Sequence, residues 1–318
     1  IDSGPDPQSV VRFARDLSSL WVGAERTRIG IAVSGGPDSL ALLLLAHAAF
    51  PGRVEAATVD HGLRPESASE ARFVTDVCTE RGIAHAILTC AVEAGNVQDR
   101  ARSARYAALE MWAKARDLTA IATAHHADDQ AETMLMRLNR GSGLSGLAGI
   151  RAATITPGGD TLLLRPLLSW RRAELAQVVE AEGITPIRDP SNEDPRFDRV
   201  RMRSALKEAA WIDPAALARS AAHLAEAEAV LDAAVEREWA ERVRHEDEKI
   251  RYEPTAPALV QKRVAQRIVT ILGGAADLSQ IAQLIGQLKA GKGGNLAGVM
   301  VRPRSGVWVF EPEPTRRA

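Results

Sequence analysis

Short apolar runs alternate with longer amphipathic stretches over the first two-thirds of the chain. Buried strands are predicted at residues 29–33, 54–59, 84–90, 119–124 and 162–164. Apolar residues at helical spacing predict helices at 8–22, 40 onward, 66–81, 96–116, 127–140 and 170–182. This alternation is typical of a parallel sheet with helices on both faces. Ligands of such sheets bind at the C-terminal ends of the strands, so the turns around Gly35, His61 and His125 are expected to face one crevice.

The last third of the chain follows a different pattern. A basic helix is predicted at 197–210, and Asp213 is a suitable N-cap for a long alanine-rich helix that runs to about Arg244. Further helices are predicted at 261–273 and 278–290, and alternating stretches at 296–302 and 307–311 predict a β-hairpin. The predicted fold class is therefore α/β, with a parallel-sheet domain at 1–211 and a mainly helical C-terminal domain with a small hairpin at 212–318.

The turn between the first strand and the next helix reads Ser-Gly-Gly-Pro-Asp-Ser. Glycines carry no Cβ, so backbone N–H groups can approach a phosphate closely, and a helix N-terminus adds partial positive charge. A plain glycine turn between two core elements is the simpler interpretation. The strand–turn–helix context and the polar side chains favour a phosphate site. Its candidate ligands are Ser34, Gly35, Gly36, Pro37, Asp38 and Ser39, of which Asp38 can also hold Mg²⁺.

A dense polar cluster, His-His-Ala-Asp-Asp-Gln-Ala-Glu-Thr, occupies residues 125–133, where the fourth strand gives way to a helix. Asp129 and Glu132 are three residues apart and share a helix face. Two carboxylates there can bind an ammonium group or a metal, or take a proton from an attacking amine. The alternatives are a capped helix start and metal ligation, although no metal-binding spacing is obvious. The predicted phosphate crevice beside the cluster favours a functional role.

Arginines gather in two stretches of the sequence. They are Arg137, Arg140, Arg151, Arg165, Arg171 and Arg172 in the first stretch, and Arg188, Arg196, Arg199, Arg201 and Arg203 in the second, with Lys207. Such clusters can follow the phosphates of an RNA, and a solvated surface is the equally weighted alternative. Arg199, Arg201 and Arg203 would splay on a helix, so one or two of them can face a triphosphate. Two other glycine-rich stretches, 141–146 and 286–293, follow helices and are rejected as nucleotide loops.

Composition narrows the class of protein. The net charge is −1 over 318 residues, so nothing global indicates a nucleic-acid partner. Cys78 and Cys90 form no Cys-x-x-Cys pair, which argues against a disulfide framework, a zinc knuckle and a cysteine-ligated cluster. No apolar run reaches the roughly 20 residues of a membrane span. A cytoplasmic protein without a membrane partner is expected.

Specific motifs carry a resemblance to a known family. The hexapeptide at 34–39 resembles the SGGxDS loop of the N-type ATP pyrophosphatases, or PP-loop enzymes, which split ATP between the α- and β-phosphates. Further stretches, in family order, resemble the tRNA(Ile)-lysidine synthetases. They are VDHGLRPES (59–67), ARSARY (101–106), the block at 123–150, LLRPLL (163–168) and DPSNEDPRFDRVRMR (189–203). The resemblance is weak in the C-terminal third, and Val200 departs from the asparagine usual in the family's arginine block.

The resemblance implies a Rossmann-like ATP-binding domain and an activity. ATP and Mg²⁺ would drive ligation of free L-lysine to C2 of the wobble cytidine in a CAU-anticodon tRNA(Ile), through an adenylated cytidine. Asp38 would hold Mg²⁺, Asp129 and Glu132 would bind lysine, and Arg201 with Arg199 would steady the phosphates. The resemblance places His61, Arg64, Arg102 and Arg105 near the nucleotide. The arginines that would contact the tRNA, together with the helical domain, are Arg137, Arg140, Arg171 and Arg203.

Other functions remain as alternatives at this point. A PP-loop tRNA 2-thiocytidine thiolase uses cysteines on an iron–sulfur cluster, which two unpaired cysteines do not favour. A glutamine-dependent amidotransferase would need a glutaminase domain. A non-catalytic nucleotide- or tRNA-binding module would not need Asp38, Asp129 and Glu132 together. The sequence leaves a homodimer open.

Overall fold

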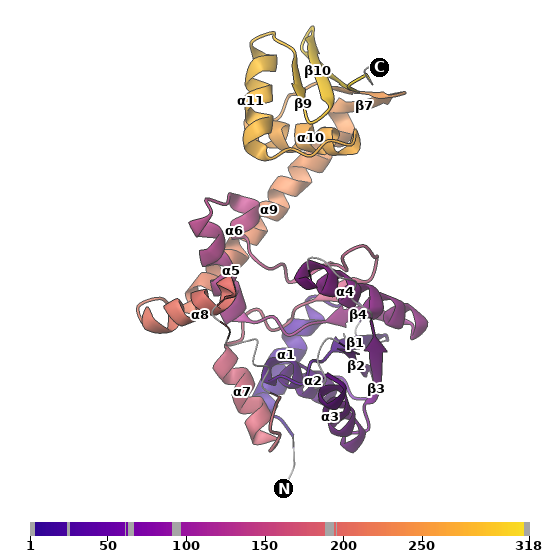
Figure 1. Cartoon of the computed structure of the whole chain (residues 1–318), viewed down its shortest axis with the longest axis vertical. Coiled ribbons are helices and arrows are strands. Elements are labelled where there is room, and N and C mark those ends of the chain that lie inside the picture. Colours follow the sequence, from indigo (N-terminus) through magenta and orange to yellow (C-terminus); the bar gives the residue numbers. More distant parts are fainter. Residues whose placement is uncertain are drawn as a thin grey trace. The chain divides into compact units, whose positions relative to one another are not determined.

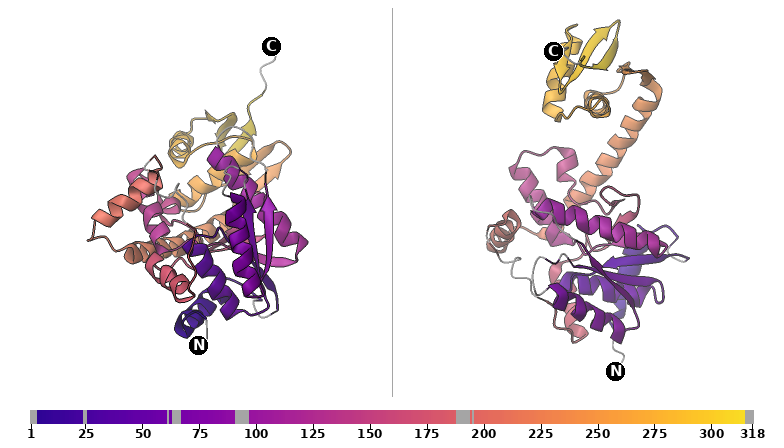
Figure 2. Two further views of the ribbon diagram at one scale, coloured as in Figure 1. Left: turned by 60° about the horizontal axis from the view of Figure 1, so that its bottom comes forward. Right: turned by 45° about the vertical axis from the view of Figure 1, so that its right-hand side comes forward.

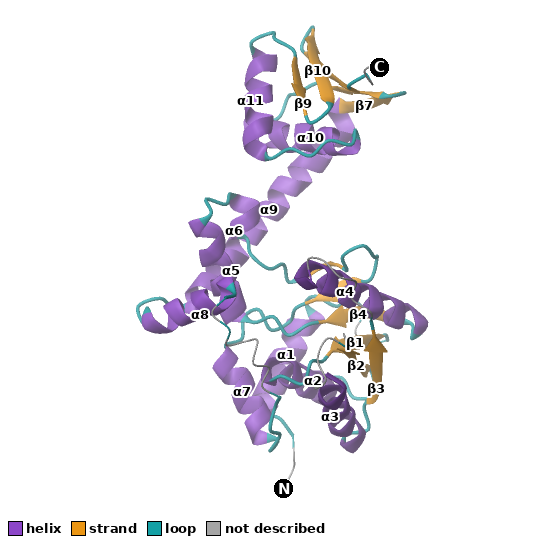
Figure 3. Ribbon diagram, viewed as in Figure 1, coloured by secondary structure: helices purple, strands orange, loops and turns teal. Residues whose placement is uncertain are grey.

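The computed structural model describes residues 4–23, 26–60, 62, 67–90, 97–187, 194 and 196–314, with the backbone alone at 97–99. The chain divides into two compact units, residues 1–225 and 226–318. The division falls inside helix α9 (Pro214–Arg242), whereas the boundary predicted between residues 211 and 212 precedes this helix. Figure 3 shows that each unit contains a sheet and helices of its own.

The first unit is built on a six-stranded sheet in the order β3-β2-β1-β4-β6-β5. Its strands are β1 (Arg28–Ala32), β2 (Val54–Asp60), β3 (Ala84–Thr89), β4 (Leu118–Ala122), β5 (Ala153–Ile155) and β6 (Leu162–Leu164). All neighbours are parallel except β5, which pairs with β6 antiparallel. The predicted parallel sheet is confirmed, and the three-residue edge strand β5 was not predicted.

Helices cover both faces of this sheet, as the alternation predicted (Figures 1 and 2). The helices that precede α9 are α1 (Pro7–Ser18), α2 (Pro37–Ala49), α3 (Ser67–Glu80), α4 (Val97–Ala115), α5 (Ala127–Asn139), α6 (Leu144–Leu147), α7 (Arg172–Ala181) and α8 (Asp198–Glu208). One core joins α1, α2, α3 and α7 to the sheet, and a second packs α4 on the opposite face. Gly30 of β1 admits the α4 packing, because a Cβ there would lie 2.5 Å from the Trp112 ring.

The connections from the central strands fix where a ligand can bind. The chain leaves β1 for β2 on one side, while β4 pairs with the other side of β1. In open α/β sheets a crevice forms at such a switch point, beyond the carboxyl ends of the strands. The turn at residues 33–36 follows β1, and His125 and His126 follow β4. The two segments that border the predicted crevice therefore follow adjacent strands, β1 and β4.

The second unit packs two helices on a five-stranded antiparallel sheet in the order β7-β8-β11-β10-β9. Its elements after α9 are β7 (Val243–Glu246), β8 (Lys249–Tyr252), α10 (Ala258–Ile271), α11 (Leu278–Lys289), β9 (Gly294–Leu296), β10 (Val299–Arg304) and β11 (Val307–Pro312). The predicted hairpin is confirmed as β10 and β11. It is part of a larger sheet. The long helix predicted to run to about Arg244 ends at Arg242, because Val243 and Arg244 belong to β7.

None of the helices in the described part of the chain is long and apolar enough to cross a membrane.

Candidate active site

The turn after β1 is braced by its own hydroxyl groups. Ser39 Oγ accepts a hydrogen bond from Ser34 N at 3.1 Å and donates one to the Gly36 carbonyl at 3.0 Å. Gly36 is the N-cap of α2 and has no side chain to cap the helix, while Pro37 occupies the first turn. The N-terminal amides of α2 are therefore left to an anionic ligand, as helix N-termini commonly are.

The backbone conformation at position 35 favours glycine, and the space beside it is narrow. Its φ is +81°, a left-handed conformation that side chains rarely adopt. A Cβ there would also lie 2.5 Å from Ile187 Cδ1. The backbone fixes this approach, since Ile187 N donates to the Gly35 carbonyl at 3.0 Å. The sequence predicted the phosphate turn but gave no sign that residue 187 supports it.

Among the described residues, one oxygen of Asp38 contacts neighbouring side chains and the other has no partner. Its Oδ2 lies 3.5 Å from His126 Nε2 and 4.0 Å from Arg172 Nε. Its Oδ1 is buried and has no hydrogen-bond partner in the described part of the chain. A buried carboxylate oxygen left unpaired is costly. The position beside the phosphate turn suits a hard cation such as Mg²⁺, which is commonly bound by one or two carboxylates plus substrate phosphates.

His126 connects the phosphate turn to the polar cluster. It is 2% exposed, and its Nε2 lies 3.6 Å from Asp129 Oδ2 in addition to its contact with Asp38. It is also the N-cap of α5, where its backbone N donates to Asp129 Oδ2 at 3.0 Å. The capped helix start that the sequence allowed is therefore real, and it holds Asp129 on the same side of the sheet as the turn. The sequence gave no role to His126.

The pKa values of the two neighbouring histidines, His125 and His126, are shifted in opposite directions. Burial, together with the charges of Arg165 and Arg199, lowers the pKa of His125 to about 4 against the opposing effect of Asp129. Burial also acts to lower the pKa of His126, but Asp38, Asp129 and Asp128 outweigh it, so this pKa is raised above 6.5. At neutral pH, His125 is therefore an uncharged group at the crevice.

We expect His125 to remain neutral down to about pH 5. Its pKa falls from 6.5 to about 4 on folding, so the stability it contributes is present above pH 6.5 and is lost as the pH falls toward 4. An NMR titration of ¹³C-labelled histidines, assigned with the His125→Asn variant, would measure this directly. A His125 midpoint near 6.5 would show that the ring is open to solvent.

Glu132 is held by an arginine that the sequence assigned elsewhere. Its carboxylate is 2% exposed and accepts from Arg203 Nε at 2.7 Å. Burial acts to lower the pKa of Arg203, but Glu132, Asp129 and Asp38 outweigh it and raise this pKa. Arg203, predicted to contact the tRNA, therefore lies among the crevice carboxylates. Since α8 turns 100° per residue, Arg199 shares this face and donates to Thr133 Oγ1 at 3.2 Å.

Arg201 lies apart from the carboxylates of the crevice. Its side chain is 58% exposed and pairs with Asp198, one turn earlier in α8, and it donates to the Arg196 carbonyl at 3.1 Å. Asp198 also pairs with Arg140 at 3.0 Å. The splay predicted for the arginine block is confirmed, and the role predicted for Arg201 on the phosphates stays a prediction.

Two of the arginines predicted to contact tRNA brace the first unit. Arg171 binds Asp128 with a closest distance of 3.0 Å, and the same carboxylate accepts from Arg172 N at 2.8 Å, which ties α5 to the start of α7. Arg137 donates to the Gly146 carbonyl at 2.6 Å and so supports the glycine-rich loop.

The structure describes only some of the residues that were predicted to lie near the nucleotide. Arg105 is exposed on α4, close enough to Cys90 for its charge to lower the pKa of that thiol against the effect of burial. His61 and Arg64 lie outside the described residues. Of the site residues predicted from the sequence, five lie together: Asp38, Asp129, Glu132, Arg199 and Arg203.

The fold and the glycine turn define a PP-loop protein, and a family model described as a PP-loop domain matches residues 9–210. The tRNA(Ile)-lysidine synthase of Novosphingobium aromaticivorans is 49% identical over 312 residues, covering 96% of this chain and 94% of that protein. The enzyme of the same name from Zymomonas mobilis is 45% identical and covers 91% and 90%. The chain belongs to the tRNA(Ile)-lysidine synthase family. The match therefore continues into the C-terminal third, where the motifs were weak.

A solved structure has a similar fold over much of the chain. The U34-tRNA thiolase NcsA from Methanococcus maripaludis aligns with a TM-score of 0.55 at 16% identity, over 69% of this chain and 79% of that one. The likeness is one of fold alone.

Proposed function

We propose that this chain uses ATP to ligate L-lysine to C2 of the wobble cytidine in a CAU-anticodon tRNA(Ile), giving lysidine, AMP and pyrophosphate. The observation that carries the proposal is the position of His126 between Asp38 at 3.5 Å and Asp129 at 3.6 Å. These two contacts support a shared crevice for the phosphate turn and the carboxylate pair. The substrates ATP, lysine and tRNA are those of the cytoplasm, where we place the reaction.

In the first step, the cytosine C2 oxygen attacks the α-phosphorus of ATP. The bond between the α- and β-phosphates breaks, and pyrophosphate leaves. The turn at Ser34–Ser39 and the N-terminus of α2 would hold the departing phosphates. Mg²⁺ would bind at Asp38 and neutralise phosphate charge there. Arg199 and Arg201 would steady the phosphates, and His61 and Arg105 would lie near the nucleotide.

In the second step, the lysine ε-amine attacks C2, and AMP leaves with the former C2 oxygen. The ε-ammonium group has no lone pair, so it must lose a proton before the nitrogen attacks, and a carboxylate can accept that proton. Asp129 and Glu132 would bind the ammonium form and position it for attack. Glu132 is paired with Arg203 in this structure, so lysine binding would compete with or extend that ion pair.

The target cytidine must leave the anticodon stack to reach a crevice at the edge of the sheet, as single-stranded RNA bases can. Arg140 is 64% exposed and is the best placed of the predicted tRNA contacts in the first unit. Arg137 and Arg171 would act mainly by holding the loop and the helix that border the crevice.

The proposal predicts ATP-dependent incorporation of labelled lysine into a tRNA(Ile) transcript with a CAU anticodon. The assay measures acid-precipitable label and identifies the product nucleoside by mass. A transcript with the wobble cytidine replaced by uridine is the matched control and should stay unlabelled. Incorporation of another amine, or of sulfur, in place of lysine would overturn the proposal.

A further inference from the structure

One buried arginine of the first unit has no acidic partner. Arg165 is 6% exposed, although the sequence grouped it with cations that could follow the phosphates of an RNA. Its Nη1 donates to the Arg151 carbonyl at 2.7 Å, whereas its Nε is buried and has no hydrogen-bond partner among the described residues. Within the same part of the chain, no carboxylate pairs with its guanidinium. A buried cation without an anion is costly, so this position suits a negatively charged ligand.

Arg165 lies at the edge of the sheet where ligands of this fold bind. It follows β6, which pairs with β4, and Thr123 N donates to the Leu164 carbonyl at 3.0 Å. Arg165 and His125 therefore follow two adjacent parallel strands at their carboxyl ends. The Tyr106 side chain of α4 is close enough to the guanidinium to raise its pKa against the effect of burial. The arginine is thus held on the side of the sheet that α4 covers.

His125 is the second polar group at this position, and the reaction as proposed above gives it no role. Its ring is half-buried, and its Nδ1 lies 3.1 Å from Thr123 Oγ1. When the hydroxyl donates to Nδ1, the neutral ring carries its proton on Nε2 and offers one hydrogen-bond donor. The charges of Arg165 and Arg102 both act on this ring. We call Arg165 and His125 together the Arg165 subsite.

The Arg165 subsite borders the carboxylates that are proposed to bind lysine. Asp129 contacts His126, and its charge also acts on His125, so a negative and a positive part of the crevice lie side by side. Free L-lysine carries an ε-ammonium group at one end and an α-carboxylate at the other. The carboxylates of the crevice provide for the ammonium group, and a cation is needed for the other end.

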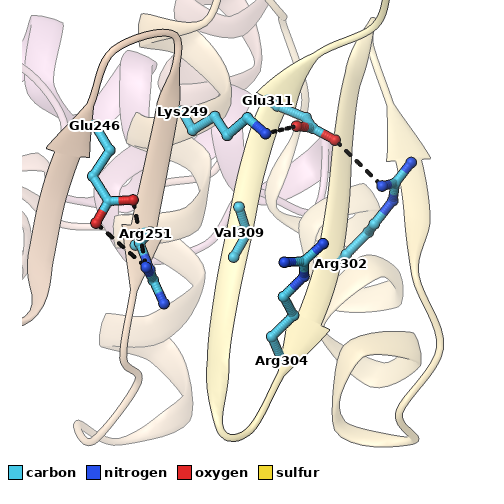
Figure 4. A pocket seen from close by; sticks show the side chains of 7 residues that line it. All are labelled: Glu246, Lys249, Arg251, Arg302, Arg304, Val309 and Glu311. Atoms are coloured by element: carbon cyan, nitrogen blue, oxygen red, sulfur yellow. Dashed lines mark hydrogen bonds and ion pairs between the residues drawn. The ribbon is translucent and has the colours of Figure 1, made fainter.

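The cations of the second unit are in a different situation. In the hollow shown in Figure 4, three cations pair with two carboxylates and their side chains are about half exposed; they are Lys249, Arg251 and Arg302, with Glu246 and Glu311. Water and carboxylates already compensate such charges. Arg165 has neither form of compensation within the described ranges, and the phosphates of ATP have a binding site of their own at the turn before α2.

We propose that the Arg165 subsite binds the α-carboxylate of the lysine substrate. The inference rests on the proposed function for the identity of the substrate, and it assigns the residues that recognise the end of lysine remote from the attacking nitrogen. The guanidinium would supply the charge and its remaining N–H donors, and the imidazole would supply one further donor. The subsite would thereby select an amino acid over an amine that lacks a carboxylate.

The test compares L-lysine with L-lysinamide, which keeps both amino groups and replaces the carboxylate with an uncharged amide. Wild-type protein should prefer lysine by about a hundredfold or more in kcat/KM, because a charged hydrogen-bonded pair is lost with the amide. In Arg165→Gln, kcat/KM for lysine should fall by about a hundredfold and that for lysinamide by much less. The preference for lysine should then be within about tenfold.

Two further variants keep the test decisive. His125→Asn removes the second donor and should lower the preference by roughly tenfold, which tests the subsite even if the Arg165 variant does not fold. Arg116→Gln is the matched control, because Arg116 precedes β4 at the opposite edge of the sheet. Its partner Glu55 keeps a second arginine, Arg28. The control should keep the wild-type preference.

The formation of adenylated tRNA without lysine separates the explanations. A folded Arg165→Gln protein that keeps the wild-type preference would overturn the inference, and so would equal losses with lysine, with lysinamide and in adenylation. The second result would show that Arg165 supports the fold or holds a phosphate. A wild type that forms no lysidine would overturn the proposed function and this inference together. A wild type that forms lysidine without preferring lysine to lysinamide would overturn the inference alone.

Discussion

Replacing Asp129 with asparagine is expected to reduce lysine transfer by at least about a hundredfold, within the range attributed to a positioned acid or base. The reason is the loss of the negative charge that would bind the lysine ammonium group and accept its proton. An asparagine oxygen can still accept the hydrogen bond that Asp129 Oδ2 receives from His126 N at 3.0 Å. The helix cap is thus preserved, and activity is changed without the loss of about 1 kcal/mol that removing a cap causes. Steady-state incorporation of labelled lysine measures the effect.

Asp128→Asn is the matched control for this prediction. Asp128 is the adjacent carboxylate, but it is occupied by Arg171 and by the backbone of Arg172. Its replacement should lower the stability of the α5–α7 contact and leave lysine transfer much closer to the wild-type rate. An equal loss of transfer in both variants would mean that total negative charge, and not the position of Asp129, determines the rate.

Replacing Arg203 with alanine is expected to lower the free energy of unfolding by about 3–5 kcal/mol and to remove lysine transfer. Glu132 is 2% exposed and is bound by Arg203 at 2.7 Å, so the variant leaves a buried carboxylate without its partner. Arg203→Lys should recover part of the stability, because a lysine keeps the charge but not the forked geometry. The change in the free energy of unfolding is measured by denaturant titration, with a spectroscopic signal that reports on the first unit.

Arg201→Ala provides the comparison within the same helix. Its side chain is 58% exposed and pairs with Asp198, so we expect a stability change of less than about 1 kcal/mol. The role predicted for Arg201 on the phosphates would then appear as weaker ATP binding in a stable protein. A destabilisation equal to that of Arg203→Ala would contradict the orientation of α8, and unchanged ATP binding would remove Arg201 from the proposed site.

The phosphate turn could be predicted from sequence because its chemistry lies in six consecutive residues. The strand before it, the two glycines, the proline and the helix after it all act locally. The same holds for the parallel sheet, whose strands and helices differ clearly in period. The position of Asp129 followed from one further rule, that the carboxyl ends of neighbouring parallel strands share an edge.

The contacts that sequence could not supply join residues distant along the chain. The pair Glu132–Arg203 and the support of Gly35 by Ile187 depend on how α8 and the segment after α7 return to the crevice. Strands β7, β8 and β9 have three or four residues each, too few to establish a period. The alanine-rich pattern of α9 also gave no stop signal before Val243.

The central claim is that one crevice carries out both steps, with the phosphate turn and Asp38 serving the first and Asp129 with Glu132 serving the second. Single-turnover reactions with ATP labelled at the α-phosphate separate these steps. Wild-type protein without lysine should place labelled AMP on the tRNA, and added lysine should release it. Asp129→Asn should form the adenylated tRNA and fail to release AMP when lysine is added, whereas Asp38→Asn should form little of it. Normal release of AMP by Asp129→Asn, or the absence of any labelled tRNA with the wild type, would contradict the account.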